Sequence, residues 1–330
     1  MNILLTGPFG NIGQAVLAEL LARGHDVRCF DVPSHRNRRV AKGWRNHPIH
    51  IQWGDLRQPE DVRRAVVGRD AIIHLAFVIP KLSATGKESE AEPEFARAVN
   101  VDGSRHLIEA VQQLAPEAKF LFTSSVHVYG PTQHLPPPRR VTDPVNPVEH
   151  YARHKVEVEK MVRASGLTWA IFRLAASMPI RMIFDPGMFD VPLDNRIEYI
   201  HRRDVALAVA NALEREAAWN RLWLIGGGPR NQYIYRDMAA KILDAMGVGM
   251  LPAQAFTTAP FAVDWMDTEE SQRVLQFQTH TLDDYVAELR RNLGWRRAWV
   301  AIFRPLVRAW LLRQSPYYHQ PVHELRPSSG

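Results

Sequence analysis

Short apolar runs alternate with longer segments of helical periodicity over residues 1–175. The apolar runs are rich in β-branched and aromatic residues, and they predict strands at 2–6, 26–31, 49–53, 70–76, 119–124 and 168–174. The segments between them place apolar residues at helical spacing, at 14–23, 60–67, 94–114 and 149–164. Strands that are almost entirely apolar and joined by long crossovers are typical of a parallel sheet covered on both faces. The pattern therefore predicts an α/β fold with a doubly wound parallel sheet.

The pattern becomes irregular after residue 174. We expect strands at 197–201 and 221–225, and helices at 203–213, 235–246 and 282–292. The sequence thus predicts a first domain over 1–175, a smaller mixed lobe over 176–293 with segments that can cross back to the first sheet, and a C-terminal extension over 294–330. Prolines in 134–147 forbid a helix there and favour an extended loop.

Composition narrows the class of protein. The chain has 330 residues, of which 46% are hydrophobic, enough for a large buried core. Cys29 is the single cysteine, so no internal disulfide forms, and no run approaches the ~18 apolar residues of a membrane span. The N-terminus lacks a basic flank and a cleavage site, which favours a cytoplasmic location. The net charge of +6 is spread among acidic residues, so nucleic acid is not an expected partner.

Three glycines follow the first predicted strand and open the first predicted helix. Gly7, Gly10 and Gly13 are spaced G-x-x-G-x-x-G. The first permits a tight turn, the second removes a Cβ where a pyrophosphate would lie, and the third lets helix and sheet pack closely. The unpaired amides of a helix N-terminus and its dipole then favour an anion. This arrangement is typical of a Rossmann-type dinucleotide site.

The end of the second predicted strand indicates which dinucleotide binds. Asp31 stands where a carboxylate accepts hydrogen bonds from the ribose hydroxyls of NAD and repels the 2′-phosphate of NADP. The sequence therefore predicts NAD, although the arginines that follow, at 36, 38 and 39, keep NADP as an alternative. Asp55 and Leu56, after the third strand, are further candidates for cofactor contact.

A serine, a tyrosine and a lysine form the candidate catalytic group. Tyr151 and Lys155 are spaced i, i+4 on a predicted helix, so their side chains share one face. An ammonium beside a phenol favours the phenolate, so we expect a lowered pKa that lets Tyr151 exchange a proton. Ser125 stands at the carboxyl end of the fifth strand, where open α/β sheets bind ligands, and is expected to hold the substrate oxygen.

These residues resemble the NAD-dependent epimerase/dehydratase branch of the extended short-chain dehydrogenases. The resemblance covers about residues 1–290 and includes TGPFGNIG (6–13), Asp31, Asp55-Leu56, HLA (74–76), NVDGSRHLIEA from Asn100, SSVHVYG (124–130), YARHK (151–155), YIHRRDVALAV (199–209) and LIGGGP (224–229). It implies that Tyr151 is the general acid/base, that Lys155 holds the nicotinamide ribose and tunes Tyr151, and that Ser125 polarises the substrate.

The same resemblance implies further cofactor contacts, a substrate lobe over 176–293, and a homodimer formed through the helices at 94–114 and 149–164. The residues that it places along the cofactor groove lie in the glycine turn, after the fourth strand and in the following helix. They are Gly7, Gly10, Asn11, Ile12, Gly13, Asp31, Asp55, Leu56, Leu75, Ala76, Asn100, Tyr151 and Lys155.

Two motifs depart from the family pattern. Val126 and His127 stand where dehydratases carry an Asp-Glu pair, so dehydration is disfavoured, although His127 can transfer protons and is a candidate substrate contact. The sixth strand ends in Arg173-Leu-Ala-Ala176, where nucleotide-sugar epimerases carry Arg-Pro-x-Asn, and the missing asparagine argues against a nucleotide-sugar substrate. Arg202 and Arg203 are candidates to hold a diphosphate, with helix-surface ion pairing as the alternative. No histidine spacing indicates a metal site.

The C-terminal segment 294–318 has no acidic residue. Its apolar residues at 299, 302, 303, 306 and 310 recur at helical spacing, and its arginines at 297, 304 and 308 gather on another face. Pro305 is expected to kink or split the helix. We expect the segment to dock on the protein's own lobe or on a dimer partner, with an anionic membrane surface as the alternative.

Three functions remain open from the sequence. The first is an NAD-dependent epimerase or oxidoreductase of a nucleotide sugar. The second is an NAD(P)-dependent dehydrogenase or reductase of a non-sugar alcohol or ketone, such as a steroid-like compound. The third is a non-catalytic NAD-binding scaffold or regulator, against which the presence of Ser125, Tyr151 and Lys155 argues.

Overall fold

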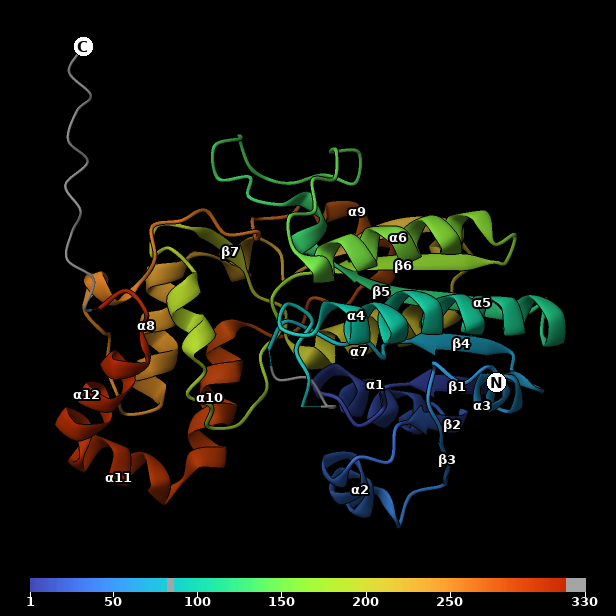
Figure 1. Cartoon of the computed structure of the whole chain (residues 1–330), viewed down its shortest axis with the longest axis horizontal. Helices are drawn as coiled ribbons and strands as arrows, with labels where there is room; N and C mark the ends of the chain where they lie inside the picture. Colours follow the sequence, from blue (N-terminus) through green and yellow to red (C-terminus); the bar gives the residue numbers. More distant parts are fainter. Residues whose placement is uncertain (82–85, 319–330) are drawn as a thin grey trace. The chain divides into compact units, whose positions relative to one another are not determined.

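The computed structural model describes residues 1–81 and 86–318, and its main feature is one parallel sheet. Seven strands lie in the order β3-β2-β1-β4-β5-β6-β8, and every neighbouring pair is parallel. In Figure 1 the labels β6, β5, β4, β1, β2 and β3 follow one another from top to bottom. Their bounds are β1 Asn2–Thr6, β2 Asp26–Asp31, β3 Ile49–Trp53, β4 Ala71–His74, β5 Lys119–Ser125, β6 Trp169–Leu174 and β8 Arg221–Ile225. The predicted α/β fold with a doubly wound parallel sheet is confirmed.

Helices cover both faces of this sheet. α1 (Asn11–Ala22) packs against α7 (Arg202–Leu213). In the other layer, α3 (Pro59–Val66) packs against α5 (Gly103–Leu114), and α5 lies beside α6 (His150–Ala164). The strand order reverses between β1 and β4, and the carboxyl ends of strands at such a switch point form the ligand crevice of open α/β sheets.

Burial follows position in the sheet. All four residues of β4 and six of the seven residues of β5 are buried, as expected for central strands. β3 differs from the expectation of burial on both faces, because it is an edge strand with His50 and Ile51 exposed. The core between the layers is filled by large side chains, among them Phe120, Phe122 and Phe172.

Several elements differ from their predicted bounds. The segment 94–114 is α4 (Pro93–Arg97), a π-helical turn (Ala98–Asp102) and α5 rather than one helix. Two helices were not predicted: α2 (His35–Ala41), which Ser34 caps, and α9 (Glu269–Leu275), which packs on β8. The segment 134–147 contains no helix or named strand, as its prolines predict.

The chain divides into two compact units. The first unit contains Met1–Pro179, Arg196–Tyr233 and Ala262–Leu282; the second contains Ile180–Asn195, Ile234–Phe261 and the chain from Asp283 onward. The predicted lobe over 176–293 is therefore divided, because β8 pairs with β6 and α7 packs on α1 in the first unit.

The smaller elements complete these units. β7 (Arg196–Glu198) pairs with β9 (Gln232–Ile234) in a two-stranded sheet. The second unit is largely helical, with α8 (Tyr235–Ala245), α10 (Leu282–Leu293), α11 (Trp295–Ile302) and α12 (Arg304–Gln314). Across the described residues, none of the helices has both the length and the hydrophobicity needed to cross a membrane.

Candidate functional site

The glycine turn between β1 and α1 contains three glycines with different environments. Gly7 has φ +69°, and a Cβ there would lie 2.9 Å from the backbone nitrogen of Ala76. A Cβ on Gly13 would lie 2.0 Å from the carbonyl oxygen of Gly7, so this position must be glycine for the turn to close. A Cβ on Gly10 would meet only that same oxygen, at 3.4 Å. Packing explains Gly7 and Gly13, whereas the space beside Gly10 stays open, as the predicted approach of a ligand requires.

The glycine turn leads into the N-terminal end of α1, which carries a partial positive charge. Gly10 is the N-cap of α1, and Asn11, Ile12 and Gly13 form its first turn, which contains no acidic side chain. The first amides of a helix have no acceptor within the helix, and the dipole favours negative charge there. These residues therefore fit the pyrophosphate of a dinucleotide.

Asp31 lies at the end of β2 beside this turn. Its carboxylate accepts hydrogen bonds from the amides of Val32 (2.9 Å) and Phe9 (3.5 Å) and from the side-chain amide of Asn37 (2.8 Å). Burial raises the pKa of Asp31 to about 6, because the hydrogen bonds offset only part of the cost of removing the charge from water. The position of Asp31 fits contact with a ribose.

Leu75, Ala76 and Asn100, which are also predicted to contact the cofactor, make hydrogen bonds around the end of β4. Leu75 and Ala76 donate their backbone N–H groups to the Thr6 hydroxyl, both at 3.1 Å. The Asn100 side chain exchanges two hydrogen bonds with the backbone of Val78, at 2.6 and 2.9 Å. In this structure these residues fix the chain that follows β4.

Asp55 and Leu56 have structural partners at the end of β3. Burial raises the pKa of Asp55, but hydrogen bonds from Arg57 outweigh this effect and the pKa is lowered overall. The Arg57 guanidinium lies 2.6 Å from that carboxylate. Leu56 is buried and packs where Gly103 leaves space in α5. A role for either residue in cofactor contact stays a prediction.

The structure brings Ser125, Tyr151 and Lys155 together. Ser125 is the last residue of β5, and its hydroxyl is hydrogen-bonded to Tyr151. Tyr151 and Lys155 lie one turn apart on α6, with the Lys155 ammonium 5.6 Å from the centre of the Tyr151 ring. The Lys155 ammonium donates to the carbonyl of Thr123 at 2.6 Å. The i, i+4 spacing predicts the proximity of Tyr151 and Lys155, and the end of the fifth strand is where the sequence analysis places Ser125; their catalytic roles stay predictions.

The pKa of Tyr151 is opposite to the sequence expectation. Burial raises it to about 12, and the hydrogen bond from Ser125 offsets only part of this rise. Burial also lowers the pKa of Lys155, whose ammonium lies 3.5 Å from the centre of the Phe77 ring and 4.8 Å from that of Phe122. The lysine is therefore held among aromatic rings rather than against the phenol oxygen, and Tyr151 is a neutral phenol at neutral pH.

His127 lies beside the catalytic group. Its ring meets the Tyr151 ring edge to face at 5.9 Å, and its Nδ1 lies 2.8 Å from the Glu149 carboxylate. The predicted diphosphate contacts, Arg202 and Arg203, begin α7, where His201 caps the helix by accepting from the Arg203 amide. In residues 1–81 and 86–318, no three His, Cys, Asp or Glu side chains gather as a metal site requires.

Arg173 is part of the core rather than of a ligand site. Its guanidinium makes two hydrogen bonds to the carboxylate of Glu159 in α6, at 2.9 and 2.7 Å, and one to the Tyr129 hydroxyl at 2.8 Å. Both charged side chains are buried. These hydrogen bonds tie β6 to α6, the helix that carries Tyr151.

The sequence analysis did not identify two residues of the site, Phe77 and Glu90. Phe77 contacts both the Lys155 ammonium and the Tyr151 ring, the latter at 5.8 Å between ring centres. Glu90 accepts from the amides of His150 (3.0 Å) and Tyr151 (2.9 Å) and so caps α6. Phe77 directly follows the HLA motif, which is a usable signal, whereas nothing in the sequence links Glu90 to a helix that begins 60 residues later.

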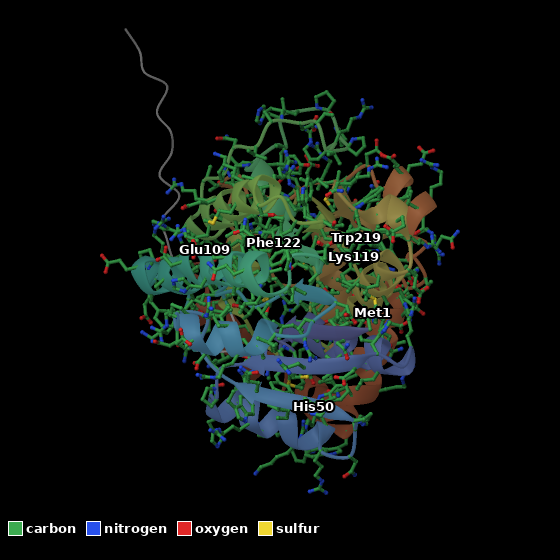
Figure 2. All side chains as sticks on the ribbon, turned by 90° about the vertical axis from the view of Figure 1, so that its right-hand side faces the viewer. Met1, His50, Glu109, Lys119, Phe122 and Trp219 are labelled. Atoms are coloured by element: carbon green, nitrogen blue, oxygen red, sulfur yellow. The ribbon has the colours of Figure 1, made fainter. Side chains whose placement is uncertain are left out.

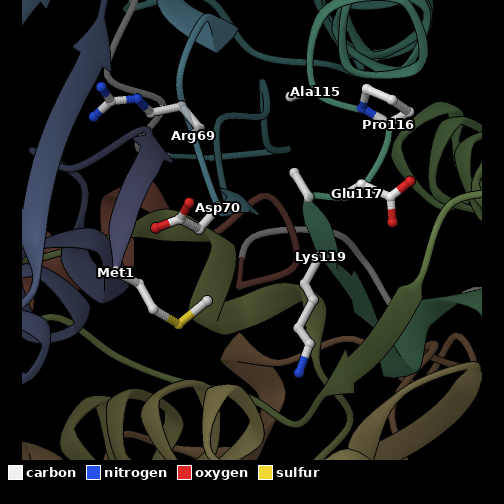
Figure 3. A pocket seen from close by; sticks show the side chains of 8 residues that line it. Met1, Arg69, Asp70, Ala115, Pro116, Glu117 and Lys119 are labelled. Atoms are coloured by element: carbon white, nitrogen blue, oxygen red, sulfur yellow. The ribbon is translucent and has the colours of Figure 1, made fainter.

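A pocket lies at the amino ends of the strands, opposite the end of the sheet that carries Ser125. It has a volume of about 400 Å³ and is lined by the start of β1, β4 and β5, with Met1, Asp70, Glu117 and Lys119 among its residues (Figure 3). Figure 2 shows Lys119 beside Trp219 at this end, and its ammonium lies 5.2 Å from the centre of the Trp219 ring. Because the strands are parallel, this pocket opens at their amino ends, away from the catalytic group.

Comparison with known proteins places these features in a family. The family model for the NAD dependent epimerase/dehydratase family matches residues 3–178. The chain is 37% identical over 126 residues to a 3-beta-hydroxysteroid dehydrogenase of Mycolicibacterium neoaurum, covering 38% of this chain and 32% of that protein. It is 32% identical over 162 residues to a D-erythronate dehydrogenase of Cupriavidus necator, covering 47% of each. The chain thus spans less than half the length of these two relatives.

The fold is also that of a solved enzyme. The structure of UDP-glucose-4-epimerase from Stenotrophomonas maltophila, with bound NAD and formylated UDP-arabinopyranose, superposes with a TM-score of 0.72 at 23% identity and covers 92% of this chain and 99% of that one. Together with the glycine turn and the grouping of Ser125, Tyr151 and Lys155, the family match identifies this chain as a member of the NAD dependent epimerase/dehydratase family.

Proposed function

We propose that this chain catalyses NAD-dependent hydride transfer at a hydroxyl-bearing carbon. The observation that carries the proposal is the contact between Ser125 and Tyr151, with Lys155 one helical turn away, at the carboxyl edge of the sheet. A scaffold protein needs none of these three side chains at this edge. NAD, when bound, accepts and returns the hydride.

The protein residues would manage the proton. As a neutral phenol, Tyr151 donates to the oxygen of a ketone as that oxygen gains negative charge, and in the reverse direction it takes the proton back. Ser125 holds the same oxygen by a hydrogen bond and so orients the reacting carbon. Lys155 supplies positive charge one turn away, which favours the phenolate when the proton has left.

We infer that NAD is preferred over NADP. Asp31 places a carboxylate beside the glycine turn, and a 2′-phosphate would meet its negative charge. The arginines that follow are partly engaged: the Arg38 guanidinium donates to the carbonyl of Pro33 and lies 5.3 Å from the centre of the Trp53 ring.

A nucleotide sugar is the first candidate substrate, with epimerisation as the net reaction. The family membership supports it, as does the solved epimerase of the same fold with its bound nucleotide sugar. Arg202 and Arg203 are the proposed diphosphate contacts. Dehydration is disfavoured, because Val126 and His127 supply no Asp-Glu pair.

A non-sugar alcohol is the second candidate, and two observations favour it. The relative with 37% identity is a 3-beta-hydroxysteroid dehydrogenase by name. The chain after β6 offers Ala175 and Ala176 rather than an amide side chain, and Phe77 adds an aromatic surface beside Tyr151. On this alternative, NADH leaves and the net reaction is oxidation.

A substrate panel with a matched pair of variants tests the proposal. Purified chain is incubated with NAD and either nucleotide sugars or secondary alcohols, including a 3β-hydroxysteroid, while NADH absorbance and product stereochemistry are followed. Tyr151→Phe should lower turnover at least ~100-fold and leave NAD affinity nearly unchanged, since general acid/base catalysis contributes about 10²–10⁴-fold. Tyr317→Phe, which removes a phenol hydrogen bond to Asp190, should keep full activity.

The outcomes distinguish an epimerase, a dehydrogenase and a non-catalytic scaffold. Inverted sugar without NADH accumulation identifies an epimerase, and NADH accumulation with an alcohol identifies a dehydrogenase. Turnover that survives in Tyr151→Phe contradicts the mechanism. NAD binding without turnover of any compound on the panel counts against both enzymatic candidates and favours the scaffold.

A further inference from the structure

The C-terminal helix pair, α11 and α12, turns arginines toward its own unit. Arg297, Arg304 and Arg308 donate to backbone carbonyls of the segment 245–250, at 3.0, 3.0 and 2.6 Å. This segment follows the end of α8, where helix carbonyls lack partners within the helix and the dipole favours cations. These arginines, together with the buried side chains of Val300 and Leu311, hold the helix pair on its own unit.

A further set of apolar side chains on the helix pair is largely exposed, although the Trp310 ring meets that of Phe184 edge to face at 5.8 Å. We call this the aromatic face: Trp295, Trp299, Ile302, Leu306 and Trp310. Trp295, Ile302 and Leu306 are 71%, 70% and 69% exposed. The expectation that the segment docks on the protein's own lobe holds for the three arginines and for Val300 and Leu311, which are buried. Docking of the exposed apolar side chains on a dimer partner stays a prediction. Five exposed apolar side chains on two adjoining helices, unlike a single exposed side chain, mark an interaction surface.

Charge indicates what the aromatic face binds. Residues 294–318 contain five arginines and no acidic residue, and Arg296 and Arg313 are themselves exposed. A second copy of this face would bring like charges together, whereas an anionic lipid surface is complementary to it. Tryptophan together with arginine is typical of helices that lie at the level of lipid headgroups.

We propose that the aromatic face docks this chain on an anionic lipid bilayer, with α11 and α12 lying in the plane of the surface. The break at Phe303, just before Pro305, gives two helices of 8 and 11 residues, each too short to cross a bilayer but long enough to lie in its interface. The proposal does not depend on the enzymatic function, since it uses only residues of the second unit.

Vesicle co-sedimentation of the full chain tests this. The chain should bind vesicles of phosphatidylcholine with phosphatidylglycerol, bind phosphatidylcholine alone far more weakly, and dissociate as salt is raised. Trp295→Ser with Leu306→Ser should weaken binding at least ~10-fold, because both side chains are solvent-exposed and insert directly. Arg296→Gln with Arg313→Gln should weaken it about 30-fold, since each arginine near an anionic surface contributes a factor of about five.

Two controls keep the test decisive. Val67→Ser with Val141→Ser removes exposed apolar side chains of the first unit and should leave vesicle binding unchanged. Circular dichroism should show the same melting temperature for every variant as for the unmodified chain. The proposal is overturned if anionic vesicles do not bind the chain, or if the Trp295/Leu306 variant sediments as before. It is equally overturned if that variant abolishes a concentration-dependent dimer in the absence of lipid, since the aromatic face then belongs to a second copy.

Discussion

We expect the charge state of one residue, Asp31, to determine how the proposed NAD site responds to pH. Burial holds the pKa of Asp31 at about 6, above its value in an unfolded chain. The folded chain without NAD therefore binds a proton that the unfolded chain releases, and its stability falls as pH rises from about 4 to about 6. Ribose hydroxyls need the opposite form, because only the ionised carboxylate accepts from both.

NAD affinity should therefore decrease as the pH is lowered. Below about pH 6, the dissociation constant of NAD should rise about tenfold per pH unit, as Asp31 must lose a proton before binding. Calorimetric titration with NAD between about pH 5 and about pH 8 measures this. Asp31→Asn should bind NAD more weakly at neutral pH and show a flat profile over the same range. A slope that persists in Asp31→Asn would assign the titration to another group.

The proximity of the candidate residues could be predicted from the sequence, but the direction of their pKa shifts could not. The i, i+4 spacing of Tyr151 and Lys155 correctly predicted their proximity. It gave the wrong direction for the pKa of Tyr151, because burial depends on side chains brought from elsewhere, such as Phe77. Similarly, Glu90 reaches the start of α6 through tertiary structure that no local pattern records.

At the scale of an element, the turn between β1 and α1 contains one glycine that the fold requires, Gly13, and one that we expect to be required for binding, Gly10. Gly13→Ala should destabilise the protein strongly, because its Cβ would lie 2.0 Å from the carbonyl oxygen of Gly7 in the backbone of the turn. Gly10→Ala should leave the melting temperature nearly unchanged, because that Cβ would find only a 3.4 Å contact and the residue's φ of −72° suits alanine. NAD binding should nevertheless weaken at least ~10-fold in Gly10→Ala, since the Cβ enters the space of the pyrophosphate.

Thermal unfolding and NAD titration of the two variants check this contrast. Gly43→Ala is the matched control, because a Cβ at Gly43 meets no atom within 4 Å and should change neither property. Equal NAD affinity in Gly10→Ala and the unmodified chain would show that the pyrophosphate lies elsewhere.

Strands and helices could be predicted from the sequence where a single local pattern of apolar residues determines them. The first six strands each read as an apolar run, and the structure contains all of them. The helix α2 was not predicted, because its sequence HRNRRVA carries little apolar periodicity. The π-helical turn at Ala98–Asp102 was missed because a continuous helical pattern does not reveal a local change of winding.

At the scale of the whole molecule, the division into two units limits what NAD can stabilise. Every residue predicted to contact the cofactor lies in the first unit, whereas α8, α11 and α12 lie in the second. A ligand present at about 100 times its dissociation constant stabilises the state that binds it by about 2.7 kcal/mol. Local opening in a unit that makes no contact with the ligand is unaffected.

Hydrogen exchange with mass spectrometry should show this division. At short labelling times, NAD should slow exchange in the turn Gly7–Gly13 and in the segment after β4, while exchange in α8 and α12 stays the same. Gly10→Ala, at the same NAD concentration, should lose the protection in the turn because it binds NAD poorly, and this separates ligand contact from general stabilisation. Equal slowing in α8 would contradict the assignment of all cofactor contacts to the first unit. It would then follow that residues of 234–261 contribute to the site, which their sequence pattern did not indicate.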